Sequence, residues 1–343
     1  MRLGVLTGGG DCPGLNAVLR AMVRTGVVDH DDRFVGFLDA WSGMLDDRTI
    51  TLDIDRLHGT LTEGGTILGT RRGSPYDHPH GPARVADAIA RHRLDALVVI
   101  GGNGSLAIAS RLFDDLSLPV IGVPKTIDND VMGTDRCIGF ATAVQTATDA
   151  IDRLRTTAES HHRVMFVEVM GRHAGWIAAH AGIAGGAAGV LVPEHAFALD
   201  DLRRLIERRH DHGHLASIIV VAEGAEPLPG TLPLPPPHLD QFGHVRLGGI
   251  ATTIAHALDD EVAAELRVVR LGHVQRGGSP VAEDRVLATR LGIAAVDAAH
   301  EGSFGQMIAW TNGEIGSVAL GHIAGRTRLL DPRTIELARV MTG

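Results

Sequence analysis

The sequence predicts a doubly wound α/β fold, and three observations support this prediction. Short runs rich in Val, Ile and Leu alternate along the chain with segments of helical periodicity. The apolar runs are continuous, as is typical of strands buried on both faces of a parallel sheet. Glycine-rich or charged segments follow most of these runs directly. Alternation of this kind predicts a parallel sheet with helices on both faces.

Seven apolar runs are the expected strands. They are Leu3–Thr7, Ala96–Ile100, Val120–Pro124, Val164–Val169, Gly189–Val192, Ser217–Ala222 and Leu266–Leu271. Helical periodicity predicts helices over Leu15–Val28, Ser105–Phe113, Thr142–Thr156, Ala174–Ala184, Leu202–His210, Gly249–Leu258, Ala282–Ala299 and Arg333–Met341. Asn312-Gly313, between two apolar runs, predicts a hairpin. Segment 227–240 holds six prolines, which exclude a central strand or helix, so we expect a surface excursion there.

Length and composition narrow the class of protein. The chain has 343 residues, enough for two domains, and its 44% hydrophobic and 21% charged residues are ordinary for a globular protein. The net charge of −9 disfavours nucleic-acid binding by bulk attraction. Two cysteines, Cys12 and Cys137, exclude a disulfide scaffold and favour a reducing compartment. The sequence shows neither a secretory leader nor an apolar run of about 20 residues. We therefore expect a cytoplasmic protein without a nucleic-acid or membrane partner.

Ligands of doubly wound folds bind at the carboxyl ends of the strands, so the segments that follow the strands are the candidate site. They read GGGDCPG (8–14), GGNGS (101–105), PKTIDND (124–130), MGRHAG (170–175), AEGA (222–225) and GHVQRGG (272–278). The first lies between a strand and a helix, where glycines and a helix N-terminus favour phosphate binding. A tight strand-to-helix turn explains that segment equally well. The second repeats the arrangement, which favours a polyphosphate ligand.

PKTIDND is the most specific of these segments. Asp128 and Asp130 are spaced i, i+2, so in an extended stretch both carboxylates point to one side. One is suited to accept a proton and the other to help hold a cation. Lys125 is the only lysine in the chain and adds a charge suited to phosphate. The alternative, an Asp/Asn-rich turn that closes a strand, leaves this lysine unexplained.

Cationic side chains accompany several strand ends. Arg163, Arg172, Arg267 and Arg276, together with His273, favour a phosphorylated substrate, and Glu223 is suited to bind sugar hydroxyls. Histidine clusters at 161–162 and 210–214 fit no zinc-ligand spacing, and we interpret them as surface histidines.

In this order, GGGDCPGLN, PKTIDND, MGRHAGW and GHVQRGGSP resemble the type A 6-phosphofructokinase family, most closely its actinobacterial mixed-substrate branch. The matches run from Leu3 to Gly278. The resemblance implies transfer of a phosphoryl group from ATP or pyrophosphate to the 1-hydroxyl of fructose 6-phosphate, with Mg²⁺ as the cofactor. It also implies two similar α/β halves with the active site in the cleft between them. We place the larger, donor-binding domain at 1–138 plus about 259–303, and the smaller, sugar-phosphate domain at 139–258 plus about 304–343.

Site residues follow from the resemblance position by position. Asp128 corresponds to the general base, Thr126 and Asp130 flank it, and Arg172 corresponds to the residue that stabilises charge on the transferring phosphoryl group. Positions that hold the sugar phosphate are Thr126, Asp128, Met170, Gly171, Arg172, Glu223, His273 and Arg276, with Arg163 and Arg267 reaching the site of a neighbouring subunit. Donor-binding positions are Gly10, Arg72, Gly73, Gly102, Asn103, Gly104, Ser105 and Lys125. Shared sites imply a homo-oligomer, a dimer or a tetramer.

Three departures from the family pattern matter. Asn103 stands where the family carries Asp or Glu, and an amide oxygen brings no charge to Mg²⁺. Gly104 leaves open the space that ATP needs, whereas Lys125 is shared with pyrophosphate enzymes, and we favour ATP. Arg20 and Arg24 match two positions of the family's effector site, but His212 and His214 stand where lysines are expected.

Three functions therefore stay open. The first is an ATP-dependent fructose-6-phosphate kinase, and the second is a reversible pyrophosphate-dependent enzyme of the same fold. The third is a sugar-phosphate-binding regulator with weakened catalysis, which only Asn103 favours.

Overall fold

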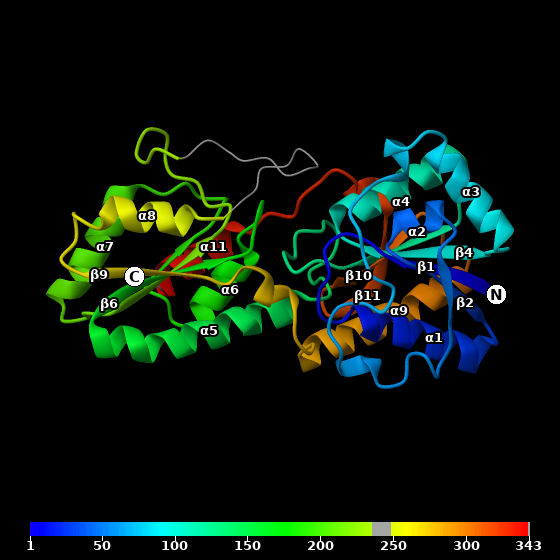
Figure 1. Cartoon of the computed structure of the whole chain (residues 1–343), viewed down its shortest axis with the longest axis horizontal. Coiled ribbons are helices and arrows are strands. Elements are labelled where there is room, and N and C mark those ends of the chain that lie inside the picture. The colour runs from blue at the N-terminus through cyan, green and yellow to red at the C-terminus, as the bar shows by residue number, and fades with distance from the viewer. Residues whose placement is uncertain (235–247, 342–343) are drawn as a thin grey trace. The chain divides into compact units, whose positions relative to one another are not determined.

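The chain forms two α/β units in the computed structural model, which describes residues 1–234 and 248–341 (Figure 1). Unit 1 consists of Met1–Thr142 and Arg276–Arg328. Unit 2 consists of Ala143–Gln275 and Leu329–Gly343. The backbone therefore passes from one unit to the other three times.

Unit 1 is built on a seven-stranded sheet in the order β11-β10-β5-β4-β1-β2-β3. Its strands are β1 (Arg2–Thr7), β2 (Arg33–Phe37), β3 (Thr49–Leu52), β4 (Ala96–Gly101), β5 (Val120–Pro124), β10 (Gln306–Thr311) and β11 (Glu314–Ala319). The five central strands run parallel, and β3 and β11 are antiparallel at the two edges. All residues of β4 and β5 are buried, which explains their uninterrupted apolar sequences.

Helices cover both faces of this sheet (Figure 1). They are α1 (Leu15–His30), α2 (Trp41–Leu45), α3 (Gly81–Arg91), α4 (Asn103–Leu116), α9 (Ala282–His300) and α10 (Leu320–Ile323). On one face, Val85 of α3 and Leu112 of α4 join Leu97 of β4 in one hydrophobic core. On the other face, α1 packs against α9. Two 3-10 turns, at Thr60–Thr62 and Pro75–Asp77, lie in the long connections of this unit.

Unit 2 holds a four-stranded parallel sheet in the order β7-β8-β6-β9. Its strands are β6 (Arg163–Val169), β7 (Gly189–Leu191), β8 (Ser217–Ala222) and β9 (Glu265–Arg270). The helices are α5 (Phe140–His161), which begins in unit 1, and α6 (Trp176–Ala184), α7 (Leu199–Asp211), α8 (Ile250–Leu258) and α11 (Pro332–Met341). Helices α7 and α8 share a core with β6 and β8 through Ile206, Ile254, Phe166 and Val221.

The predicted fold class is confirmed, and each expected strand and helix is present within a few residues of its expected bounds. The hairpin at Asn312-Gly313 is also present, as β10 and β11. Among the described residues, five helices and strands were missed, namely β2, β3, α2, α3 and α10. Strand β3 is an edge strand with only Leu52 buried, so it carries no apolar run. Strand β2 has four buried residues in a row, a short apolar run that sequence reasoning did not identify. The proline-rich excursion lies partly outside the described residues.

The unit boundaries fall later in the chain than the expected ones. Strand β9 hydrogen-bonds to β6 and therefore belongs to unit 2, so the chain returns to unit 1 only at Arg276. Strand β10 pairs with β5, which keeps the hairpin in unit 1 as far as Arg328. Among the described residues, no helix combines the length and apolar character needed to span a bilayer.

Candidate active site

The strand order of unit 1 reverses between β1 and β4, which is where doubly wound folds bind their ligands. From β1 the chain continues to β2 on one side, and it returns to β4 on the other. The turn after β1 contains Gly8, Gly9 and Gly10, and β4 is followed by Gly102, the N-cap of α4, and by Gly104 in the first turn of that helix. Two of the predicted phosphate-binding turns therefore flank one switch point.

These two turns are packed closely enough to require glycine. A Cβ on Gly8 would lie 2.3 Å from Oγ of Ser105, and one on Gly101 would lie 2.4 Å from Cβ of the same serine. Ser105 is thus a buried packing residue between the turns, in addition to its predicted donor role. Gly104 differs, because a Cβ there would meet no atom within 4 Å. The position that the family resemblance connects with donor choice is open.

Lys125 lies under the first glycine turn. Its Nζ donates hydrogen bonds to the carbonyl oxygens of Gly8 at 2.7 Å and Gly10 at 2.6 Å. The side chain is only 2% exposed, and this burial lowers the pKa of Lys125 below its usual value. The sequence suggested a direct phosphate contact, whereas the ammonium group here holds the backbone of the turn.

Two further side chains fix the same turn. The Thr70 hydroxyl donates to the Gly9 carbonyl at 2.6 Å, and Arg276 Nη1 donates to the Asp11 carbonyl at 3.2 Å. A Cβ on Gly10 would lie 2.5 Å from that guanidinium nitrogen. Arg276, predicted as a sugar-phosphate residue, thus lies against the donor turn of unit 1. The predicted donor residues Arg72 and Gly73 are exposed, just after Thr70.

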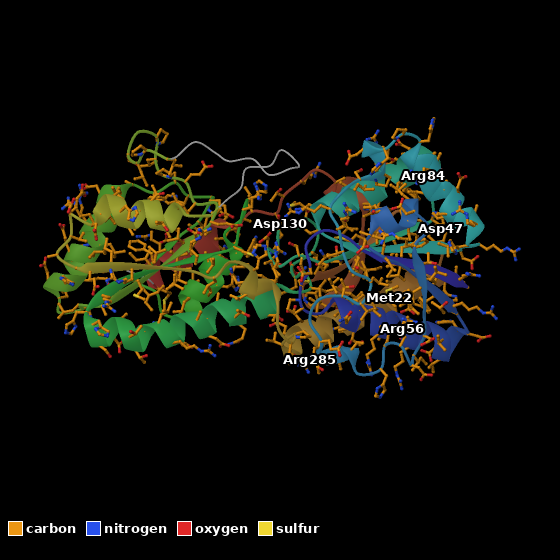
Figure 2. The ribbon with its side chains drawn as sticks, in the orientation of Figure 1. Met22, Asp47, Arg56, Arg84, Asp130 and Arg285 are labelled. Carbon is orange, nitrogen blue, oxygen red and sulfur yellow. The ribbon has the colours of Figure 1, made fainter. Side chains whose placement is uncertain are left out.

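The turn after β5 carries the predicted catalytic carboxylates. Thr126 and Asp128 are half-buried, and the Asp128 backbone N–H donates to Thr126 Oγ1 at 3.2 Å. Asp130 is 9% exposed, and burial, with the nearby charge of Asp128, raises the pKa of Asp130 to about 7. Figure 2 shows Asp130 well apart from Asp47 and Arg84 of the same unit. Two neighbouring carboxylates, one costly to ionise, form a site that favours a cation.

Asn103 is anchored to this turn. Its side-chain amide nitrogen donates to the Asp130 carbonyl at 3.2 Å. This hydrogen bond holds Asn103, which stands where the family carries an acid, next to the turn that bears the two carboxylates. It also uses a hydrogen of the Asn103 amide nitrogen within the protein. Among the described residues, no group of three or more His, Cys, Asp and Glu side chains has the arrangement of a metal site.

Sequence reasoning missed Arg328, which supports the carboxylate turn from a distant part of the chain. Its backbone N–H donates to the Asp130 carbonyl at 2.8 Å, and its Nη1 donates to the carbonyls of Asn129 at 3.3 Å and Asp135 at 3.1 Å. Val131 and Thr327 form an isolated antiparallel bridge next to it. No local motif marks Arg328, so only the fold identifies it.

In unit 2, the predicted sugar-phosphate residues lie at the carboxyl ends of β6 and β8. Met170, Gly171 and Arg172 follow β6, and the Glu223 N–H, after β8, donates to the Val169 carbonyl at 2.9 Å. Gly171 has φ 143°, and a Cβ on Gly224 would lie 2.1 Å from the Arg172 carbonyl oxygen. The backbone around Arg172 is therefore held tightly between two glycines.

The turn after β9, Gly272–Arg276, carries the exposed His273. Gln275 is fully buried, and its side chain accepts from the Met170 N–H at 3.4 Å and donates to the Gly272 carbonyl at 3.1 Å. Sequence reasoning missed this glutamine, although it lies inside the GHVQRGG motif. It connects the turn that bears His273 to the turn after β6.

Arg163 and Arg267 lie at the opposite edge of this sheet. Arg163 is the first residue of β6, and Arg267 is the third residue of β9, opposite Met165, whereas Arg172 follows the carboxyl end of β6. Strand β6 has seven residues and so spans about 20 Å, more than an arginine side chain reaches. Arg163 therefore lies beyond side-chain reach of the same copy's Arg172 turn.

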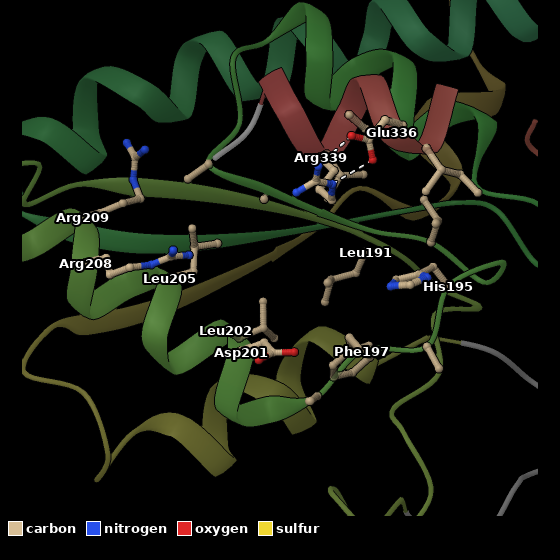
Figure 3. A pocket seen from close by; sticks show the side chains of 18 of the residues that line it. Leu191, His195, Phe197, Asp201, Leu202, Leu205, Arg208, Arg209, Glu336 and Arg339 are labelled. Carbon is tan, nitrogen blue, oxygen red and sulfur yellow. Dashed lines mark hydrogen bonds and ion pairs between the residues drawn. The ribbon is translucent and has the colours of Figure 1, made fainter. Parts of the chain in front are cut away.

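Two cavities lie away from these turns and contain none of the predicted site residues. One, of about 780 Å³, lies in unit 2 between α7, β7 and α11 (Figure 3). Leu191, Phe197 and Leu202 line it, with an Arg339–Glu336 ion pair at one wall. His212 and His214 also line it. The other, of about 380 Å³, lies in unit 1 and is lined by Arg20 and Arg24.

Comparison with known proteins gives one consistent result. The family model described as phosphofructokinase matches residues 2–299. The pyrophosphate–fructose 6-phosphate 1-phosphotransferase of Streptomyces coelicolor is 49% identical over 343 residues, all of both chains. The ATP-dependent 6-phosphofructokinase 3 of the same organism is 51% identical over 320 residues, 93% of this chain and 94% of that protein. Phosphofructokinase from Saccharomyces cerevisiae superposes with a TM-score of 0.80 at 32% identity, over 99% of this chain and 45% of that chain. The resemblance inferred from the motifs is confirmed, and the chain belongs to the phosphofructokinase family.

Proposed function

We propose that this chain transfers the terminal phosphoryl group of ATP to the 1-hydroxyl of fructose 6-phosphate and releases fructose 1,6-bisphosphate. The observation that carries the proposal is the turn after β5. There Asp128 is half-buried beside Asp130, whose pKa is raised to about 7, and Lys125 of the same segment holds the glycine turn after β1. The proposed base and the glycine turn thus follow two strands, β5 and β1, that are separated in the sheet by β4 alone, and Lys125 joins their ends.

In this mechanism Asp128 accepts the proton of the attacking sugar hydroxyl. Asp128 is half-buried and so within reach of a substrate, whereas Asp130 is more buried and harder to ionise. Thr126 positions Asp128 through the bond from the Asp128 N–H to Oγ1. Arg172 stabilises the charge that spreads over the transferring phosphoryl group.

The residues on the carboxylate turn fit Mg²⁺. Asp128 and Asp130 supply oxygen ligands. Burial, and after it the charge of Asp128, raises the pKa of Asp130, and a bound cation favours the ionised form of both carboxyl groups. Asn103 has its amide nitrogen committed to the Asp130 carbonyl, so an oxygen remains as a neutral ligand. Mg²⁺ binds few protein groups and keeps donor phosphates and water as other ligands. When bound, it neutralises phosphate charge.

We assign binding of the sugar phosphate to the strand ends of unit 2. This set consists of Met170, Gly171, Glu223 and His273. Arg276 lies against the turn after β1 and either binds the sugar phosphate with them or contacts the donor phosphates. Arg163 and Arg267 serve the site of a second copy, which their place at the amino edge of the sheet supports. The active form is then a homo-oligomer in a cytoplasm where the free thiols Cys12 and Cys137 stay reduced.

Pyrophosphate is the second candidate donor. The open space at Gly104 favours ATP, which needs room beyond its phosphates. Lys125 favours pyrophosphate by family resemblance, but its contacts with the Gly8 and Gly10 carbonyls suit any phosphate chain bound at the turn. Relatives with either donor in their names are about equally similar to this chain.

The test is the initial rate with fructose 6-phosphate and Mg²⁺, with ATP and pyrophosphate compared at matched concentrations through an aldolase-coupled assay. We expect turnover with ATP. Turnover with pyrophosphate alone would contradict our choice of donor.

Asn103→Asp, assayed beside the wild type, separates an enzyme from a regulator. For an enzyme we expect the variant to need several-fold less Mg²⁺ for half-maximal rate, because it gains a charged ligand. A silent wild type with an active variant would identify a binding protein derived from a kinase.

A further inference from the structure

One carboxylate joins the two arginines at the amino edge of the sheet of unit 2. In the register of the parallel pair, Arg163 lies opposite Glu265 and Met165 lies opposite Arg267. Residues two apart on a strand share a face, so Arg163, Glu265 and Arg267 are on the same face of the sheet. Strand β9 is the edge strand, which leaves this group next to solvent.

Glu265 is hydrogen-bonded to both guanidinium groups. Arg163 Nε donates to its Oε2 at 2.5 Å, and Arg163 Nη2 donates to its Oε1 at 3.2 Å. Arg267 Nη2 donates to the same Oε1, and its Nη1 donates to the Leu266 carbonyl at 2.9 Å. These contacts lower the pKa of Glu265, first through the hydrogen bond from Arg163, so the carboxylate stays ionised near neutral pH.

A carboxylate and a phosphate compete for the N–H donors of two neighbouring arginines such as Arg163 and Arg267. Guanidinium groups bind both anions through paired N–H···O bonds in the same fork geometry. The side chains of Arg163, Glu265 and Arg267 are 26%, 40% and 52% exposed, so an incoming anion has access to all three. With Glu265 in place, three N–H donors of this pair, from Arg163 Nε, Arg163 Nη2 and Arg267 Nη2, already have a carboxylate acceptor.

We propose that Glu265 is a built-in competitor of the sugar phosphate, and that it must release Arg163 and Arg267 before they bind the phosphate of fructose 6-phosphate held by a second copy of this chain. This inference rests on the proposed function, since it uses the same substrate. Exposed ion pairs are weak, so the carboxylate lowers affinity without closing the site. A phosphate dianion carries more charge than a carboxylate and displaces it at sufficient concentration. Glu265 thereby sets the concentration of sugar phosphate at which the enzyme responds.

The test is Glu265→Gln, which keeps the size of the side chain and removes its charge. Glu261→Gln, an exposed carboxylate four residues earlier, is the matched control for the loss of one negative charge. For each protein the KM for fructose 6-phosphate and kcat are measured at saturating donor, at low and high salt, with the oligomeric state checked by sedimentation. We expect Glu265→Gln to lower KM about two- to fivefold with kcat within twofold, and the effect to shrink in high salt. Glu261→Gln should leave both constants unchanged.

An unchanged KM in Glu265→Gln would overturn the proposal, and so would a raised KM, because it would mean that Glu265 positions the arginines for binding. The outcome is separable from that of the proposed function. If the wild type turns over fructose 6-phosphate with neither donor, the proposed function fails. Calorimetric titration with fructose 6-phosphate then still decides the competitor role, with tighter binding expected for Glu265→Gln.

Discussion

The Nζ of Lys125 lies 2.6 Å from the carbonyl oxygen of Gly10, and it bonds the Gly8 carbonyl as well. The only lysine of the chain thus ties the end of β5 to the turn after β1. Two carbonyls of the turn thus share one buried ammonium group, and Thr70 and Arg276 bind the carbonyls of Gly9 and Asp11 beside them. This geometry explains why the lysine suits donors as different as ATP and pyrophosphate, since it acts on the turn.

Lys125→Met should destabilise unit 1 and weaken donor binding together. Two buried carbonyls lose their partner, at a cost of about 1–3 kcal/mol in free energy of unfolding. The KM for whichever donor is active should rise, because the turn is no longer fixed. Urea denaturation and donor saturation curves measure both effects, with the exposed Arg56→Met as the control. A raised KM with unchanged stability would instead indicate direct contact with phosphate.

Asp128→Ala should abolish turnover and spare substrate binding. Loss of a general base reduces a rate by about 10²–10⁴-fold, whereas the sugar phosphate has several other partners. Calorimetry with fructose 6-phosphate measures binding, and the coupled assay measures turnover. Asp87→Ala, on the exposed side of α3, is the control. Turnover equal to the wild type would remove Asp128 from the mechanism.

Asp130→Asn should change how stability depends on pH. The pKa of Asp130 is raised from 3.8 to about 7, so between these values the folded protein binds a proton that the unfolded chain releases. The free energy of unfolding therefore falls by roughly a few kcal/mol as pH rises from about 4 to 7, because over this range Asp130 ionises in the unfolded chain and stays protonated in the folded protein. The variant cannot ionise, so without Mg²⁺ it should equal the wild type near pH 4 and exceed it near pH 8. Urea denaturation at both pH values measures this difference, and parallel profiles would refute the prediction.

Gly104→Asp should suppress use of ATP and preserve use of pyrophosphate. A Cβ at position 104 meets no atom within 4 Å, so the variant should fold as the wild type does. The side chain occupies space that only the larger donor needs. Rates with the two donors measure the change, and Gly104→Ala controls for the loss of glycine. Equal loss with both donors would show that position 104 affects phosphate binding generally.

Local sequence determined the elements and the positions of the site. Continuous apolar runs predicted β4 and β5 because strands buried on both faces need no polar positions. The six segments identified as functional each follow a strand, whereas four predicted site residues do not, namely Arg72, Gly73, Arg163 and Arg267. The motifs also identified the family.

Other features depend on residues far apart in the sequence. Arg328 supports Asp130 across about 200 positions, and Glu265 pairs with Arg163 across about 100, so no local pattern predicts either contact. The sequence indicated that Lys125 matters for phosphate. That it bonds two carbonyls instead follows from the parallel pairing that places β5, β4 and β1 side by side. Residue types and strand ends are properties of the chain itself, whereas hydrogen-bond partners and burial exist only once distant segments pack together.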